Sequence, residues 1–117
     1  MKISVLRSKL HRATVTDADL EYEGSISVCK ELLKVAGLHL YEKVSIYNIN
    51  NGARFSTYII EGKKGEICLN GAAARHAHRG DKVIIVAYGM IDENEINSYQ
   101  PCAVLLGDNN TVKEVVK

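Results

Sequence analysis

Tryptophan is absent from this 117-residue sequence, and proline and phenylalanine each occur only once. An excess of one charge is also missing, because 15 lysine and arginine residues balance 14 acidic residues to a net charge of +1. We therefore expect neither nucleic acid nor an anionic membrane as an electrostatic partner. No apolar run approaches the roughly 18 residues of a membrane-spanning helix. The N-terminal segment MKISVLRSKLHR lacks the apolar core of a secretory signal, so a cytoplasmic protein is expected.

Cysteine is scarce and irregularly placed. Cys29, Cys68 and Cys102 are odd in number and form no CxxC pair, so neither a disulfide framework nor a zinc site is indicated. His76 and His78 form an H-x-H pair, but no third ligand stands at a recognisable spacing. We expect buried free thiols in a reducing compartment and no metal site.

Short β-rich segments separated by turn residues run through the chain, which has the length of a single domain, residues 1–117. Asn51-Gly52 indicates a hairpin with a two-residue type I′ turn. A helix is expected at Ser27–Ala36, with Ser27 as its N-cap and Gly37 as its stop, and one helical turn at residues 71–75. Many short strands with one or two short helices favour a mainly β fold, a compact β-barrel. Strands are expected at residues 3–6, 12–16, 44–47, 55–60, 66–69, 82–88 and 103–106.

The Gly24-Ser25 peptide allows two interpretations. Glycine and serine cluster in turns for conformational reasons, and an ordinary turn is the simpler one. In the other, the Ser25 hydroxyl attacks the Gly24 carbonyl and shifts the chain from amide to ester, and elimination and hydrolysis then leave a pyruvoyl group. Backbone strain supplies only about 1–3 kcal/mol for this. A hydrogen-bond donor aimed at the developing oxyanion would add a further ~10²–10³ in rate, so donors must lie nearby.

The segment Arg54-Phe55-Ser56-Thr57-Tyr58 follows the predicted hairpin turn. On a regular strand, Arg54, Ser56 and Tyr58 share one face, and Phe55 and Thr57 share the other. A solvated outer face is one interpretation of this pattern. The other is a guanidinium that binds a carboxylate beside a phenol able to donate a proton.

Two smaller patterns complete the candidates. The small residues of Asn70–Ala74 let a ligand approach the backbone, and the free N–H groups of a helical turn can bind an anion; a plain turn is the alternative. Lys9 and His11 would face the same way on a strand, where an exposed basic edge is the alternative.

Taken in order, these segments resemble one family. The chain is similar to the pyruvoyl-dependent L-aspartate 1-decarboxylases from Met1 to about Asp108. The segments that carry the similarity are KLHRATVTDADLEYEGSISV, YNINNGARFSTY, NGAAA and GDKVIIVAY. YEGS together with NGxRFxTY is the most specific part of the match. Tyr47 stands where the family commonly has tryptophan.

The resemblance implies a proenzyme that cuts itself between Gly24 and Ser25 into a small chain, 1–24, and a large chain, 25–117. Ser25 becomes a covalent pyruvoyl group, which forms a Schiff base with L-aspartate; no metal and no pyridoxal phosphate take part. The products are CO₂ and β-alanine, which feeds pantothenate and coenzyme A biosynthesis. The implied architecture is a small double-psi β-barrel in a homotetramer, with active sites between subunits.

The resemblance also assigns residue roles. Thr57 helps the cleavage and contacts substrate, and Tyr58 is the proton donor. The further substrate-binding residues are Lys9, Arg54, Asn70, Gly71, Ala72 and Ala73. Thr57 and Tyr58 point to opposite faces of a regular strand, so a bulge, a strand end or a site shared between subunits is needed to bring them together.

Two other functions remain open at this stage. A small β-barrel that only binds a ligand would keep Gly24-Ser25 as an uncut turn. A metal-dependent enzyme would use His76 and His78 and would lose its activity to chelators.

Overall fold

Nine strands, one α-helix and three short 3₁₀ helices make up the computed structural model, which describes residues 1–117. The predicted mainly β fold with short helices is confirmed. The strands are β1 (Lys2–Thr14), β2 (Asp17–Asp19), β3 (Ser25–Cys29), β4 (Lys43–Asn48), β5 (Arg54–Gly62), β6 (Ile67–Asn70), β7 (Lys82–Asp92), β8 (Cys102–Leu106) and β9 (Val112–Val116). The helices are α1 (Lys30–Ala36) and the 3₁₀ segments η1 (Gly71–His76), η2 (Glu93–Ser98) and η3 (Asp108–Asn110).

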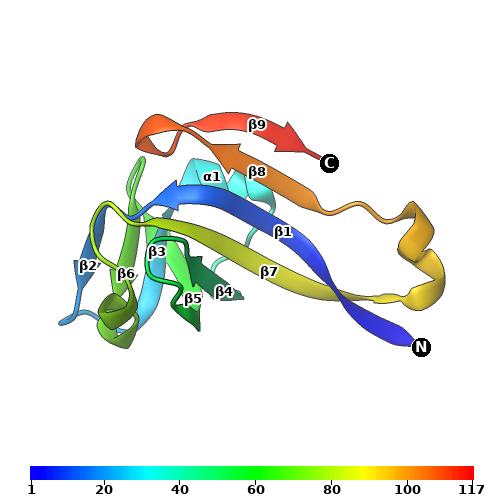
Figure 1. Ribbon diagram of the computed structural model, residues 1–117, viewed down its shortest axis with the longest axis horizontal. Coiled ribbons are helices and arrows are strands. Elements are labelled where there is room, and N and C mark those ends of the chain that lie inside the picture. Colours follow the sequence, from blue (N-terminus) through cyan, green and yellow to red (C-terminus); the bar gives the residue numbers. More distant parts are fainter.

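The strands follow the order β2-β6-β3-β5-β4-β7-β1-β8-β9, a curled sheet consistent with a small β-barrel, in which β2 and β9 are the two ends. Most neighbours are antiparallel, but β2 with β6, β3 with β5 and β1 with β8 are parallel. β1 and β7 are long and run side by side away from the rest of the molecule to η2 (Figure 1). A cluster of 22 buried residues fills the interior of the curled sheet. No helix is long and apolar enough to cross a membrane.

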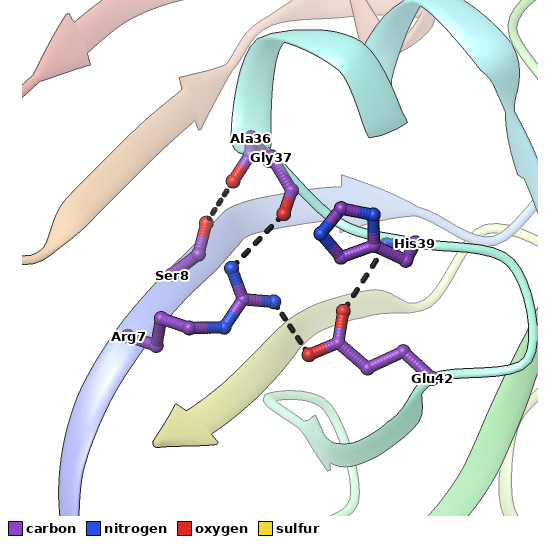
Figure 2. Close-up of polar contacts among 6 residues, drawn as sticks. All are labelled: Arg7, Ser8, Ala36, Gly37, His39 and Glu42. Carbon is purple, nitrogen blue, oxygen red and sulfur yellow. Dashed lines mark hydrogen bonds and ion pairs between the residues drawn. The ribbon is translucent and has the colours of Figure 1, made fainter. Parts of the chain in front are cut away.

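The end of α1 is fastened to β1 by polar side chains (Figure 2). The buried Ser8 hydroxyl donates to the carbonyl of Ala36 at 2.6 Å, and Arg7 donates to the carbonyl of Gly37 at 2.9 Å. The last carbonyls of a helix have no partner within the helix, so these bonds satisfy groups that would otherwise be unpaired. Arg7 also pairs with Glu42, whose other carboxylate oxygen accepts from the backbone N–H of His39.

Two predicted boundaries were wrong. The strands expected at residues 3–6 and 12–16 are parts of one strand, β1, which ends at Thr14 and shifts its register against β7 around Arg12 (φ 63°). The helix expected from Ser27 begins at Lys30, because Ser25–Cys29 is buried and paired with both β5 and β6. The predicted stop at Gly37 is confirmed, with φ of 68°.

The hairpin predicted around Asn51-Gly52 is confirmed, but its two-residue turn was wrong. Strands β4 and β5 are joined by residues 49–53, and the backbone N–H of Asn48 donates to the carbonyl of Ala53 at 2.9 Å. Only Gly52 has a positive φ, of 75°. The side-chain oxygens of Asn48 and Asn51 each accept from the backbone N–H two residues on, which stabilises this longer loop.

Candidate active site

Strand β5 changes partner along its length, and this change creates the site. Its first residues pair with β4 from Arg54↔Tyr47 to Tyr58↔Lys43, whereas β3 joins it only from Ile59 onward. The edge of β5 toward β3 is therefore unpaired along residues 54–58. Gly24, which directly precedes β3, and Thr57 of β5 line the same cavity at this edge.

A cavity of about 340 Å³ lies at this unpaired edge. The cavity is open to a strand edge rather than to one face of the sheet, so residues with opposite orientation both border it. Thr57 and Tyr58 therefore both line the cavity, although they lie within β5 and not at its end. The cavity is lined by Gly24, Phe55, Ser56, Thr57, Tyr58, Ala72, Ala73 and His76.

Ser25 is buried at the first position of β3, opposite Asn70 at the end of β6. Its hydroxyl donates to the carbonyl of Glu23 at 3.0 Å and accepts a hydrogen bond from the Asn70 side-chain amide at 3.0 Å. Both hydrogen bonds fix the hydroxyl next to the Gly24-Ser25 peptide. Asn70, a predicted site residue, thus contacts Ser25 directly.

Gly71 begins η1 directly against the residues that precede Ser25. A Cβ on Gly71 would lie 2.7 Å from both the nitrogen and the Cα of Gly24 and 3.0 Å from the carbonyl oxygen of Tyr22. Its φ of 62° is also in the left-handed region. Only glycine fits this close approach, so the two glycines pack backbone against backbone.

The segment η1 contributes part of the cavity wall. Ala72 and Ala73 line it, and the His76 ring stacks on Phe55 with centroids 4.9 Å apart. His78 instead lines a separate hollow of about 380 Å³ beside Asp17 and Arg79. His76 and His78 thus point to different places, and the structure has no group of three His, Cys, Asp or Glu side chains able to hold a metal ion.

Arg54 lies at the start of β5, on the exposed face that it shares with Tyr58. Its guanidinium lies 3.8 Å from the centroid of the Tyr47 ring, and the Tyr47 hydroxyl is hydrogen-bonded to the Tyr88 hydroxyl at 2.7 Å. The hydrogen bond with Tyr88 lowers the pKa of Tyr47, and the charge of Arg54 adds to this; the same bond raises the pKa of Tyr88. Tyr47 therefore holds the guanidinium against the sheet.

Of the predicted site residues, Lys9 lies on a strand remote from the cavity, and Arg54 lies on β5 but does not line it. The register links Lys9 through Val86 and Ser45 to Ser56, so all four share one face of the sheet. Three strand spacings separate Lys9 from β5, about 14 Å at ~4.8 Å per strand. Lys9 therefore faces the same side as Arg54 and Tyr58 without contacting them.

Three contacts around the site were not predicted from the sequence. Cys68 and Ser27 hydrogen-bond the Asn70 amide, and His76 stacks inside the cavity. Cys68 and Ser27 stand two residues from Asn70 and Ser25 on paired strands, and this period-two spacing was the only available signal. The predicted free, buried thiols are confirmed for Cys29 and Cys68, whereas Cys102 is free and half-buried.

Comparison with known proteins identifies the family. The family model described as aspartate decarboxylase matches residues 1–113. The aspartate 1-decarboxylase of Bdellovibrio bacteriovorus is 59% identical over 97% of this chain and 92% of its own length. Those of Ralstonia nicotianae and Sulfurimonas denitrificans are each 58% identical, over 98% and 100% of this chain and 98% of their own lengths. The chain therefore belongs to the aspartate decarboxylase family, and it is an enzyme of the lyase class.

Proposed function

We propose that this protein decarboxylates L-aspartate to β-alanine and CO₂ in the cytoplasm, with a pyruvoyl group made from its own Ser25. The β-alanine would serve pantothenate and coenzyme A synthesis. The observation that carries the proposal is the buried Ser25 hydroxyl, held by Asn70 at the end of the Gly24 segment and beside the cavity. The free cysteines suit a reducing compartment.

The group would form by self-cleavage. The Ser25 hydroxyl oxygen attacks the Gly24 carbonyl carbon, the Gly24–Ser25 C–N bond breaks, and the hydroxyl proton passes to the released nitrogen. The resulting ester loses the Ser25 Cα proton and its C–O bond, which gives the Gly24 carboxylate and dehydroalanine at position 25. Water then replaces the nitrogen, which leaves as ammonia, and a keto group remains. No electrons are gained or lost overall.

Thr57 is our choice for the donor that stabilises this attack. It lines the same cavity as Gly24. A donor to the oxyanion that develops on the Gly24 carbonyl contributes about 10²–10³ in rate. Backbone strain alone supplies only ~1–3 kcal/mol.

The residues around Ser25 fit a pyruvoyl group. Gly71 presents no side chain toward this segment, and the Asn70 amide donates to the hydroxyl oxygen that the cleavage would pass to the Gly24 carboxylate. When present, the group supplies the electron sink for the charge left at Cα as CO₂ departs. The protein residues then bind the substrate, exclude water and deliver a proton.

Arg54 and Tyr58 are the residues we assign to substrate. The Arg54 guanidinium, held on Tyr47, offers a fork of N–H donors to a carboxylate. Tyr58 borders the cavity and donates the proton to Cα after CO₂ has left. The backbone from Gly71 to Ala73 closes the other side.

The two faces of the sheet also support the proposed homotetramer. Gly24, Ser25 and Thr57 lie at the strand edge, whereas the half-buried Lys9 lies three strands from β5, about 14 Å along the sheet. A second carboxylate needs a second cation, which Lys9 of a neighbouring subunit packed on this side of the sheet would supply. The active site would then lie between subunits.

Self-cleavage can be tested directly by mass. Denaturing mass spectrometry of the purified protein should give two fragments, 1–24 and 25–117, and the larger should lack an amino terminus. Incubation with L-aspartate should yield β-alanine in proportion to the cut fraction. A chain that stays intact after prolonged warm incubation and makes no β-alanine would contradict the proposal.

Replacing Arg54 with lysine should raise the KM for L-aspartate by about tenfold and leave kcat nearly unchanged. Lysine keeps the charge but loses the paired donors and the planar contact with Tyr47, and a charge-assisted hydrogen bond contributes about 1.5–3 kcal/mol. Steady-state kinetics on fully cleaved protein measure this. Arg79→Lys is the matched control, because Arg79 lines a different hollow. A wild-type KM in Arg54→Lys would exclude recognition by the fork.

A further inference from the structure

We propose that Ser27 and Cys68 are positioning residues for self-cleavage, which together hold the Asn70 amide so that one of its N–H groups is directed at the Ser25 hydroxyl. The proposal rests on the self-cleavage proposed above. It concerns two residues that contact neither substrate nor the scissile bond and act through Asn70.

Three hydrogen bonds hold the amide. Its nitrogen donates to the hydroxyls of Ser25 and Ser27, both at 3.0 Å, and its oxygen accepts from the Cys68 thiol at 3.2 Å. A side-chain amide has two donor hydrogens and one acceptor oxygen, so every polar atom of Asn70 is engaged.

The direction of each bond follows from Ser25. Its single hydroxyl proton goes to the carbonyl of Glu23, so its oxygen accepts from Asn70, and the amide nitrogen must face Ser25. The amide oxygen then faces Cys68 and needs a donor there. Burial raises the pKa of the Cys68 thiol to about 11, with nearby acidic groups adding to it, so the thiol keeps its proton at neutral pH.

This arrangement prepares the nucleophile. The Ser25 hydroxyl oxygen has two lone pairs and one proton. One lone pair accepts the hydrogen bond from Asn70, and the proton is donated in a hydrogen bond to the Glu23 carbonyl. One lone pair therefore stays free to attack. If the amide turned over, its oxygen would draw the Ser25 proton away from Glu23 and rotate the hydroxyl. Cys68 opposes that turn, because its protonated thiol donates to the amide oxygen, and Ser27 holds the amide in place through its second N–H.

The contacts of Ser27 and Cys68 with Asn70 are buried, so water does not readily replace them. Ser25, Ser27, Cys68 and Asn70 are all at most 8% exposed. A buried polar atom that loses its partner is not readily compensated by water, so removal of either contact frees the amide to adopt other rotamers.

The test is the rate of self-cleavage in full-length chains made by cell-free synthesis and sampled over time by denaturing mass spectrometry. We expect Ser27→Ala and Cys68→Ala each to slow the appearance of fragments by about tenfold, because small displacements of a reacting group cost up to ~10²-fold. Cys68→Ser, which restores a donor, should return the rate to within about threefold of wild type. Cys102→Ala is the matched control: the same change in β8, with no contact to Asn70, should leave cleavage unchanged.

The outcomes separate the two proposals. Wild-type cleavage in Cys68→Ala and Ser27→Ala overturns the positioning role while self-cleavage stands. A Cys68→Ser variant as slow as Cys68→Ala also overturns it, since volume rather than hydrogen bonding would then matter. An uncut wild-type chain overturns both proposals. Slow cleavage in Cys68→Ala supports the positioning role only if the thermal unfolding midpoint of this variant matches that of Cys68→Ser. Ser27→Ala is a smaller change, and its cleavage rate tests the same role independently.

Discussion

Ser25→Ala should leave a single 117-residue chain and no β-alanine production at all. Alanine has no oxygen to attack the Gly24 carbonyl, so neither the cut nor the keto group can form. The fold should survive, because Ser25 contributes only its hydrogen bonds to Glu23 and Asn70 at the start of β3. Denaturing mass spectrometry and an assay for β-alanine measure both effects on one preparation.

A matched control for this variant is Ser4→Ala. Ser4 is an exposed residue of β1 paired with Met90, remote from the cavity, so both cleavage and activity should be normal. Decarboxylation by uncut Ser25→Ala protein would remove the pyruvoyl assignment altogether. Cleavage at Gly24 without Ser25 would show that an external protease makes the cut.

Gly71→Ala should slow self-cleavage by about a hundredfold or more. Its Cβ would lie 2.7 Å from the nitrogen and Cα of Gly24, both backbone atoms, so the segment that carries the scissile bond has to move. Displacement of a reacting group by about 1 Å costs on the order of 10² in rate. The φ of 62° adds a conformational cost of about 1–2 kcal/mol for alanine.

Gly37→Ala isolates the conformational cost. Gly37 has nearly the same φ, 68°, but no atom lies within 4 Å of its added Cβ. It should lose comparable stability and still cleave at the wild-type rate. Equal cleavage in the two variants would contradict the close approach of Gly71 to Gly24, as would a Gly71→Ala chain that is cut normally.

The two ends of α1 show which features of a helix the local sequence can predict. The spacing of apolar residues from Val28 onward is helical, and Gly37 ends the helix as predicted. Ser27 nevertheless belongs to a strand, because β5 and β6 pair with it on both sides. Pairing with distant segments outweighs a local preference of a few tenths of a kcal/mol per residue.

The hairpin shows the same limit. Asn51-Gly52 marks the reversal of the chain, and Gly52 takes the positive φ that such a turn requires. The loop length is set by side-chain bonds of Asn48 and Asn51 to the backbone, which compete with a tighter turn.

Sequence by itself determined the mainly β class and the family, and it supplied the site residues as predictions, because periodicity, turn residues and ordered motifs are all local properties of the chain. It could not place Thr57 and Tyr58 at one cavity. That depends on where β3 starts to pair with β5, a contact between distant segments. The triple hydrogen bonding of Asn70 and the separation of Lys9 from the cavity were likewise decided only by the tertiary structure, since strand order sets which side chains become neighbours.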